Sequence, residues 1–80
     1  MTIDIKIKRA TLEIALRHML RGAKKSPERT ARNLIEIGSS LSKLNLSDEA
    51  AEKLCLELSE LIKTMDHEKI MHWMIQSFRL

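Results

Sequence analysis

The side chains that could do chemistry are few and widely spaced in this sequence. The nearest approach to a set of metal ligands is Asp66, His67 and His72, with Cys55 further upstream. His67 and His72 are five residues apart, whereas two ligands on one helix face stand three or four apart. Neither a Cys-x-x-Cys nor a His-Glu-x-x-His motif occurs. The sequence therefore predicts no metal site and no cofactor.

Catalysis by a nucleophile is also not indicated. Cys55 is the single cysteine, and it lies in an apolar run with no histidine nearby in the sequence that could act as its base. Gly22 and Gly38 are the only glycines, too few for a glycine-rich phosphate loop. We therefore predict that the protein is not an enzyme and acts on no small-molecule substrate.

The basic side chains form the one group that could bind a polyanion. Residues 1–43 carry ten Lys or Arg against four Asp or Glu, and residues 44–80 carry four against seven. Several of the cations surround Ser26, where a predicted helix begins, and free N–H groups at a helix N-terminus favour phosphate. A solvated charged face is the alternative interpretation. The candidate polyanion contacts are Lys6, Lys8, Lys24, Lys25, Arg29 and Arg32.

The spacing of the apolar residues predicts an all-α protein, a small bundle made of two antiparallel helical hairpins in one domain, residues 1–80. The four helices are expected at residues 3–21, 27–43, 48–64 and 67–79. With a single cysteine, the chain has no internal disulfide to strengthen so small a core, and oligomerisation is the natural supplement. A lone cysteine and the lack of a signal peptide or membrane-spanning run predict a soluble, cytoplasmic protein.

The helix boundaries follow from capping residues. Ser26, Ser47 and Asp66 are the expected N-terminal caps, because their side chains can accept hydrogen bonds from free backbone N–H groups. Gly22 and Asn45 are expected to end the first and second helices. Another glycine, Gly38, falls inside the second helix, where it would either let another helix approach closely or produce a kink.

The first residues allow two interpretations. Ile3, Ile5 and Ile7 alternate with polar residues, as in a half-buried strand. As a continuous helix, the segment would carry two apolar stripes, one through Leu12 and Leu16 and a second through Ile3, Ile7, Ala10 and Ile14. The lack of a second strand in the chain favours the helix.

If residues 2–8 are a strand, the order of strand, helix, loop and capped helix looks like that of the ribbon-helix-helix repressors. The resemblance covers less than half of the chain. It implies that two chains pair their strands into a ribbon in the major groove, while Ser26 and its neighbours hold the DNA backbone. The side chains facing the DNA would be Thr2, Asp4, Lys6 and Lys8. This is the alternative function, a nucleic-acid-binding regulator.

The last predicted helix has too many apolar residues for one stripe, and it holds the only tryptophan and the only phenylalanine. A helix buried on several sides is hard to arrange in an 80-residue monomer. We therefore predict a homodimer, or a complex with another protein, in which this helix and the Gly38 region form the interface. The expected interface residues are Ile70, Met71, Trp73, Met74, Phe78 and Gly38. The predicted function is that of a small non-enzymatic interaction or regulatory module.

Overall fold

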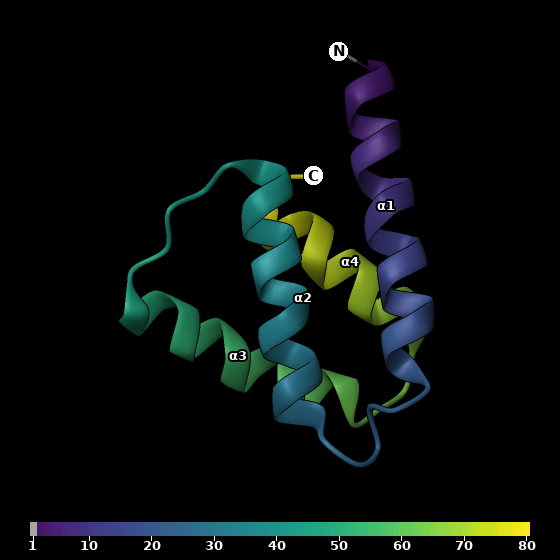
Figure 1. Cartoon of the computed structure of the whole chain (residues 1–80), viewed down its shortest axis with the longest axis vertical. Coiled ribbons are helices and arrows are strands. Elements are labelled where there is room, and N and C mark those ends of the chain that lie inside the picture. Colours follow the sequence, from purple (N-terminus) through teal and green to yellow (C-terminus); the bar gives the residue numbers. More distant parts are fainter. Residues whose placement is uncertain (1) are drawn as a thin grey trace.

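The computed structural model describes residues 2–80, with side chains from Asp4 onward, and it is a bundle of four helices (Figure 1). The helices are α1 (Thr2–Leu20), α2 (Pro27–Ser42), α3 (Asp48–Ile62) and α4 (His67–Phe78). No strand occurs within residues 2–80. The predicted all-α bundle is confirmed, and the helix bounds lie close to the predicted ones.

The choice left open at the start of the chain is resolved in favour of the helix, because residues 2–8 form the first turns of α1. The strand interpretation is wrong. A single strand leaves its backbone N–H and C=O groups without partners, whereas a helix pairs them within the segment. The resemblance to the ribbon-helix-helix repressors depends on a strand at residues 2–8, and this strand is not present.

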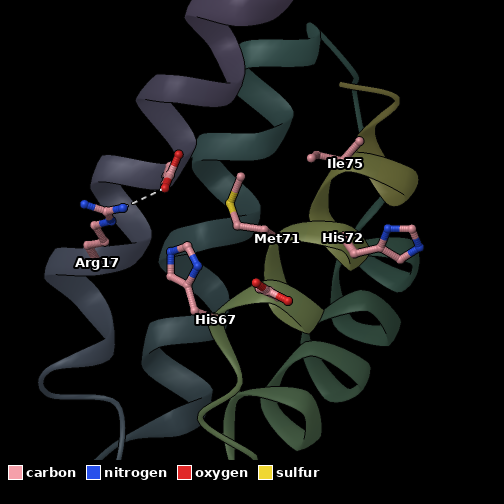
Figure 2. A pocket seen from close by; sticks show the side chains of 7 residues that line it. Arg17, His67, Met71, His72 and Ile75 are labelled. Atoms are coloured by element: carbon pink, nitrogen blue, oxygen red, sulfur yellow. Dashed lines mark hydrogen bonds and ion pairs between the residues drawn. The ribbon is translucent and has the colours of Figure 1, made fainter.

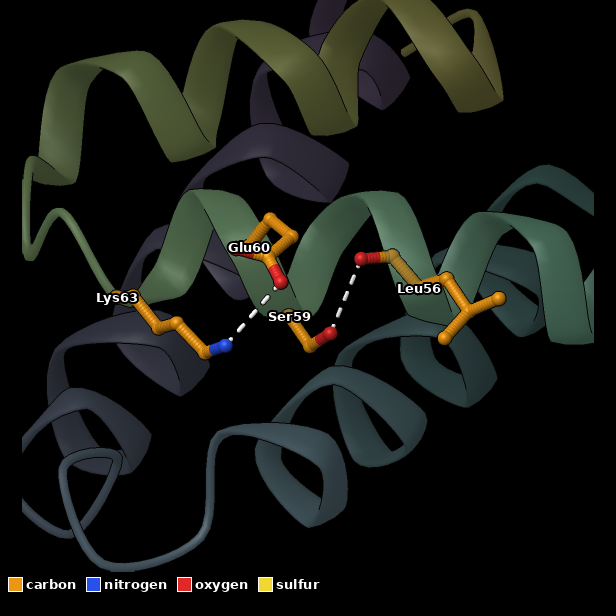
Figure 3. A network of polar contacts seen from close by, with 4 residues as sticks. All are labelled: Leu56, Ser59, Glu60 and Lys63. Atoms are coloured by element: carbon orange, nitrogen blue, oxygen red, sulfur yellow. Dashed lines mark hydrogen bonds and ion pairs between the residues drawn. The ribbon is translucent and has the colours of Figure 1, made fainter.

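The helices form two hairpins that pack across each other. In Figure 1, α1 descends and α2 ascends beside it, and α3 crosses α2 at a steep angle. α4 returns along α3 in the opposite direction and passes behind α2 (Figures 1 and 3). α4 contacts all three other helices. The premise that a helix could hardly be buried on several sides in so small a chain is therefore wrong.

The core is built from every helix and from the last residue of the chain, Leu80. Leu12 and Leu16 are fully buried on one face of α1, and they have no exposed surface. Every apolar side chain of the core comes from this one chain. The other buried apolar residues are Ala23, Ala31, Leu34, Ile35, Leu58, Ile62, Ile70, Met74, Phe78 and Leu80.

α2 and α3 approach each other across hydroxyl side chains. Thr30 and Ser59 are buried, and Ser59 lies close to the first turn of α2. The Thr30 hydroxyl donates to the Ser26 carbonyl at 3.1 Å, and the Ser59 hydroxyl donates to the Leu56 carbonyl at 3.0 Å (Figure 3). A buried hydroxyl without a partner would be costly. Because each is satisfied within its own helix, both can be buried without a partner on the facing helix.

Two of the three predicted N-terminal caps are confirmed. The Ser47 hydroxyl accepts from the Ala50 N–H, and the Asp66 carboxylate accepts from the Lys69 N–H, each at 3.2 Å. The cap at Ser26 is wrong, since its hydroxyl makes no capping hydrogen bond. The ψ angle of Ser26 is 73°, against 160° at Ser47, so the hydroxyl does not face the first turn.

The C-terminal ends depart from the prediction at one helix. α1 ends just before Gly22, whose N–H donates to the Met19 carbonyl at 3.2 Å. At the end of α2 the left-handed residue is Lys43, with φ 58°, and not Asn45. The preference of asparagine for this conformation was a weak signal, because another residue adopts it at a cost of only about 1 kcal/mol.

The end of α4 closes the fold onto α1. Arg79 is left-handed, with φ 53°, and the Leu80 N–H donates to the Ile75 carbonyl at 2.9 Å. This turn buries the Leu80 side chain and presents its carbonyl to the Arg9 Nε, which donates to it at 2.8 Å. The hydrogen bond joins residues that are 71 positions apart.

Candidate functional site

The predicted interface on α4 is divided by the structure into a buried part and an accessible part. Ile70 and Met74 have no exposed surface, and Phe78 is 1% exposed. These three side chains are buried within their own chain, so a partner could reach them only if the fold opened. The structure therefore corrects their place in the predicted interface.

The space beside Gly38 is likewise filled by a side chain of the same chain. A Cβ atom at this position would lie 2.6 Å from Cδ2 and 2.7 Å from Cε2 of the Phe78 ring. α2 continues without interruption through Gly38, so the close-approach interpretation is confirmed and the kink is wrong. The group that approaches is a side chain of the same molecule, α4's last residue, and not a second copy.

Met71 and Trp73 keep part of their surface exposed, on two different sides of α4. Met71 lies in an open groove of about 570 Å³ between α1 and α4, together with His67 (Figure 2). Trp73 lies in a second depression beside Leu61 of α3. The two side chains therefore do not form one contact surface.

The groove between α1 and α4 brings titratable side chains together, but they are not arranged as a metal or catalytic site. The His67 Nε2 is buried and has no hydrogen-bond partner. Figure 2 shows the His72 ring turned away from His67. Arg17 is paired at 2.9 Å with Glu13 of the same helix, along the α1 wall of the groove. Among the described residues no three His, Cys, Asp or Glu side chains are placed to hold a metal ion.

The basic residues fall into separate clusters. Lys6 and Lys8 lie in the first half of α1, whereas Lys24 and Lys25 lie in the loop after it. The helix between Lys6 and that loop spans roughly 20 Å at 1.5 Å per residue. A single phosphate therefore cannot contact both clusters.

The cluster near α2 is mixed with acidic groups. Arg29 and Arg32 are exposed on α2, and Arg32 lies 3.7 Å from Glu52 of α3. Near the loop, Lys63 is paired with Glu60 at 3.1 Å (Figure 3). These exposed pairs contribute little stability, and they reduce the positive potential that a polyanion would meet.

Cys55 faces a shallow cleft between α2 and α3 and is half-buried. Burial raises the pKa of its thiol; Arg32 opposes this rise and Glu52 adds to it. A thiol with a raised pKa is protonated at neutral pH and is a poor nucleophile.

The accessible apolar surface that stands out is on α1, and it was not among the predicted site residues. We use the name outer stripe for Ile7, Ala10 and Ile14, which follow one another at helical spacings of three and four. Ile7 is 58% exposed, Ile14 is 59% exposed, and Ala10 is exposed as well. The stripe lies on the side of α1 opposite the buried Leu12 and Leu16.

The signal for the outer stripe was present in the sequence. A continuous helix over residues 3–21 requires a second apolar face, and that face has no partner once Leu12 and Leu16 fill the core. The other large exposed apolar side chains described, apart from Ile5 on α1, are dispersed as single residues, as is usual on protein surfaces. They are Leu44, Leu56 and Met65.

Comparison with known protein families, curated proteins and solved structures found no match. None of the helices within residues 2–80 has the length and apolar character needed to cross a lipid bilayer.

Proposed function

We propose that the protein is a small non-enzymatic interaction module that pairs with a second copy of itself by helix packing through the outer stripe of α1. One observation carries the proposal: α1 is a single helix with apolar stripes on opposite sides, and only one of them is covered. A surface helix of a globular protein ordinarily needs only one apolar stripe. Burying an isoleucine is worth about 1.5–3 kcal/mol when it is complete, so the uncovered stripe favours association.

This proposal keeps the homodimer expected from the sequence but moves its interface from α4 to α1. The earlier reason for the dimer was the wide apolar surface of α4, which the chain itself covers. The outer stripe now supplies the reason. A regulatory role in a reducing compartment such as the cytoplasm is in keeping with the lone Cys55.

The proposal is tested by placing a charge in the stripe. We expect Ile14→Lys to raise the dissociation constant of the dimer at least about tenfold. A lysine in an apolar seam costs more than about 1.4 kcal/mol of binding free energy. The helical circular dichroism should change little, since Ile14 is 59% exposed in the single chain, and the thermal midpoint should fall only by what the dimer contributed to it. Sedimentation equilibrium of both proteins over a range of concentrations measures the change.

Leu56→Lys is the matched control, because Leu56 on α3 is also 59% exposed and the substitution adds the same charge. It should leave the dimer intact. A wild-type chain that stays monomeric, or an equal loss of dimer in both variants, would contradict pairing through the outer stripe.

A second candidate is binding of a polyanion by the cluster of Lys24, Lys25 and Arg29. These three cations are exposed around the start of α2, where the Ser26 hydroxyl does not cap the free N–H groups. The same sedimentation experiment with duplex DNA added addresses it. A complex that dissociates steeply as salt rises would favour this candidate, whereas pairing through α1 should respond weakly.

A further inference from the structure

The two flanks of the outer stripe carry different groups. Helical geometry places Lys6, Glu13 and Arg17 along one flank, where Lys6 and Glu13 are seven residues apart and Arg17 pairs with Glu13. The same geometry places Asp4, Thr11 and His18 along the other. Both flanks are accessible, since Lys6, Thr11 and His18 are exposed and the Glu13 side chain keeps 42% of its surface.

The flanks distinguish the two directions in which a pair of α1 helices can run. In an antiparallel pair each flank meets the same flank of the other copy, and in a parallel pair it meets the opposite flank. Antiparallel pairing therefore brings Lys6 opposite Glu13 of the second copy, and two-fold symmetry repeats that pair. Parallel pairing sets Lys6 against the uncharged Thr11 and Glu13 against His18 instead, so Lys6 has no acidic partner there.

The cations at the start of α1 favour the same direction. Lys6, Lys8 and Arg9 lie within one turn of each other, with Asp4 as the single nearby acid in the described part of α1. A parallel pair would set these cations of the two copies at the same level along the axis, although Arg9 faces Leu80 and Lys8 lies away from the stripe. An antiparallel pair separates them along the axis and also opposes the two helix dipoles.

We infer that two copies pair through α1 in antiparallel orientation, with Ile7 of each beside Ala10 of the other and Lys6 of each opposite Glu13 of the other. The inference rests on the proposed function. The small Ala10 side chain lets the two helix axes approach to about 8 Å. Glu13 also pairs with Arg17 of its own helix, but both side chains are exposed, so its carboxylate can accept from Lys6 in addition.

The arrangement predicts a charge-reversal pattern. Lys6→Glu and Glu13→Lys should each weaken the dimer about fivefold, because each turns two attractive pairs into two repulsive ones. The combined variant restores both pairs with the signs exchanged, and its dissociation constant should return to within about twofold of the wild type. Sedimentation equilibrium at low salt, with circular dichroism of every variant, provides the measurement.

Lys8→Glu is the matched control, since it makes the same change of charge on α1 away from the Lys6 flank. It should not be rescued by Glu13→Lys. A cross-linking experiment in a Cys55→Ser background reports the direction independently. Ile14→Cys should form no disulfide between copies, because antiparallel pairing keeps the two positions more than about 10 Å apart along the axis, whereas parallel pairing would set them side by side in the seam.

The outcomes separate the two proposals. If Ile14→Lys disrupts the wild-type dimer, but charge reversal is not rescued or Ile14→Cys cross-links readily, the antiparallel arrangement is contradicted. Pairing through the outer stripe then remains in place. A wild-type chain that does not dimerise contradicts both.

Discussion

Replacing Phe78 with alanine is expected to remove about 3–5 kcal/mol from the free energy of unfolding, the usual cost of deleting a buried aromatic ring. Phe78 is 1% exposed and packs directly on Gly38. A domain of this length has roughly 4–12 kcal/mol of stability in total. The variant should therefore be largely unfolded in mild denaturant, which urea unfolding followed by circular dichroism measures.

Trp73→Ala is the comparison that separates burial from size. Tryptophan is the larger side chain, but Trp73 is only half-buried beside Leu61. We expect its loss to cost clearly less than the loss of Phe78. If Trp73→Ala were the more damaging change, or if Phe78→Ala unfolded like the wild type, the packing described for the end of α4 would be wrong.

Replacing Gly38 with alanine is expected to destabilise the fold by about 1–2 kcal/mol, although the same change inside an ordinary helix gains about 1 kcal/mol. The new Cβ would lie 2.6 Å from the Phe78 ring, so the ring or the helix must move. The ring cannot move freely, because the next turn ties Leu80 to Ile75. The midpoint of urea unfolding measures the sign of the effect.

The chain offers a control and a rescue for this prediction. Gly22→Ala meets no atom within 4 Å and has no positive φ, so it should be neutral or slightly stabilising. In a Phe78→Leu background the flat ring is gone, and Gly38→Ala should cost less than in the wild type. Additive costs in this double-mutant cycle would show that the two residues do not interact as described.

The elements of the fold could be predicted because their signals are local. Ser47 and Asp66 cap the helices that follow them, and the apolar spacing within each segment shows which face turns inward. Ser26 shows the limit of such reasoning. Its residue type suits a cap, but the backbone angle that decides whether the hydroxyl faces the helix is set by the loop and not by the residue.

The candidate site could not be predicted in the same way, because the sequence does not say which molecule covers an apolar face. The wide apolar surface of α4 indicates that this helix is buried on several sides. A second copy or the rest of the same chain could cover that surface equally well. Only the three-dimensional arrangement places Phe78 on Gly38 of the same chain. The second stripe of α1 is visible in the sequence, but only the arrangement of the other helices shows that it stays uncovered.

The hydrogen bond between Arg9 and Leu80 bears on the kinetics of the fold. Its partners are 71 positions apart, so forming it closes a loop that contains most of the chain. Closing so long a loop costs conformational entropy, and this cost is smaller once the local helices and their hairpins have formed. An interaction made after the transition state leaves the folding rate unchanged and slows unfolding. We therefore expect the contact between α1 and residue 80 to slow unfolding and to have little influence on the folding rate.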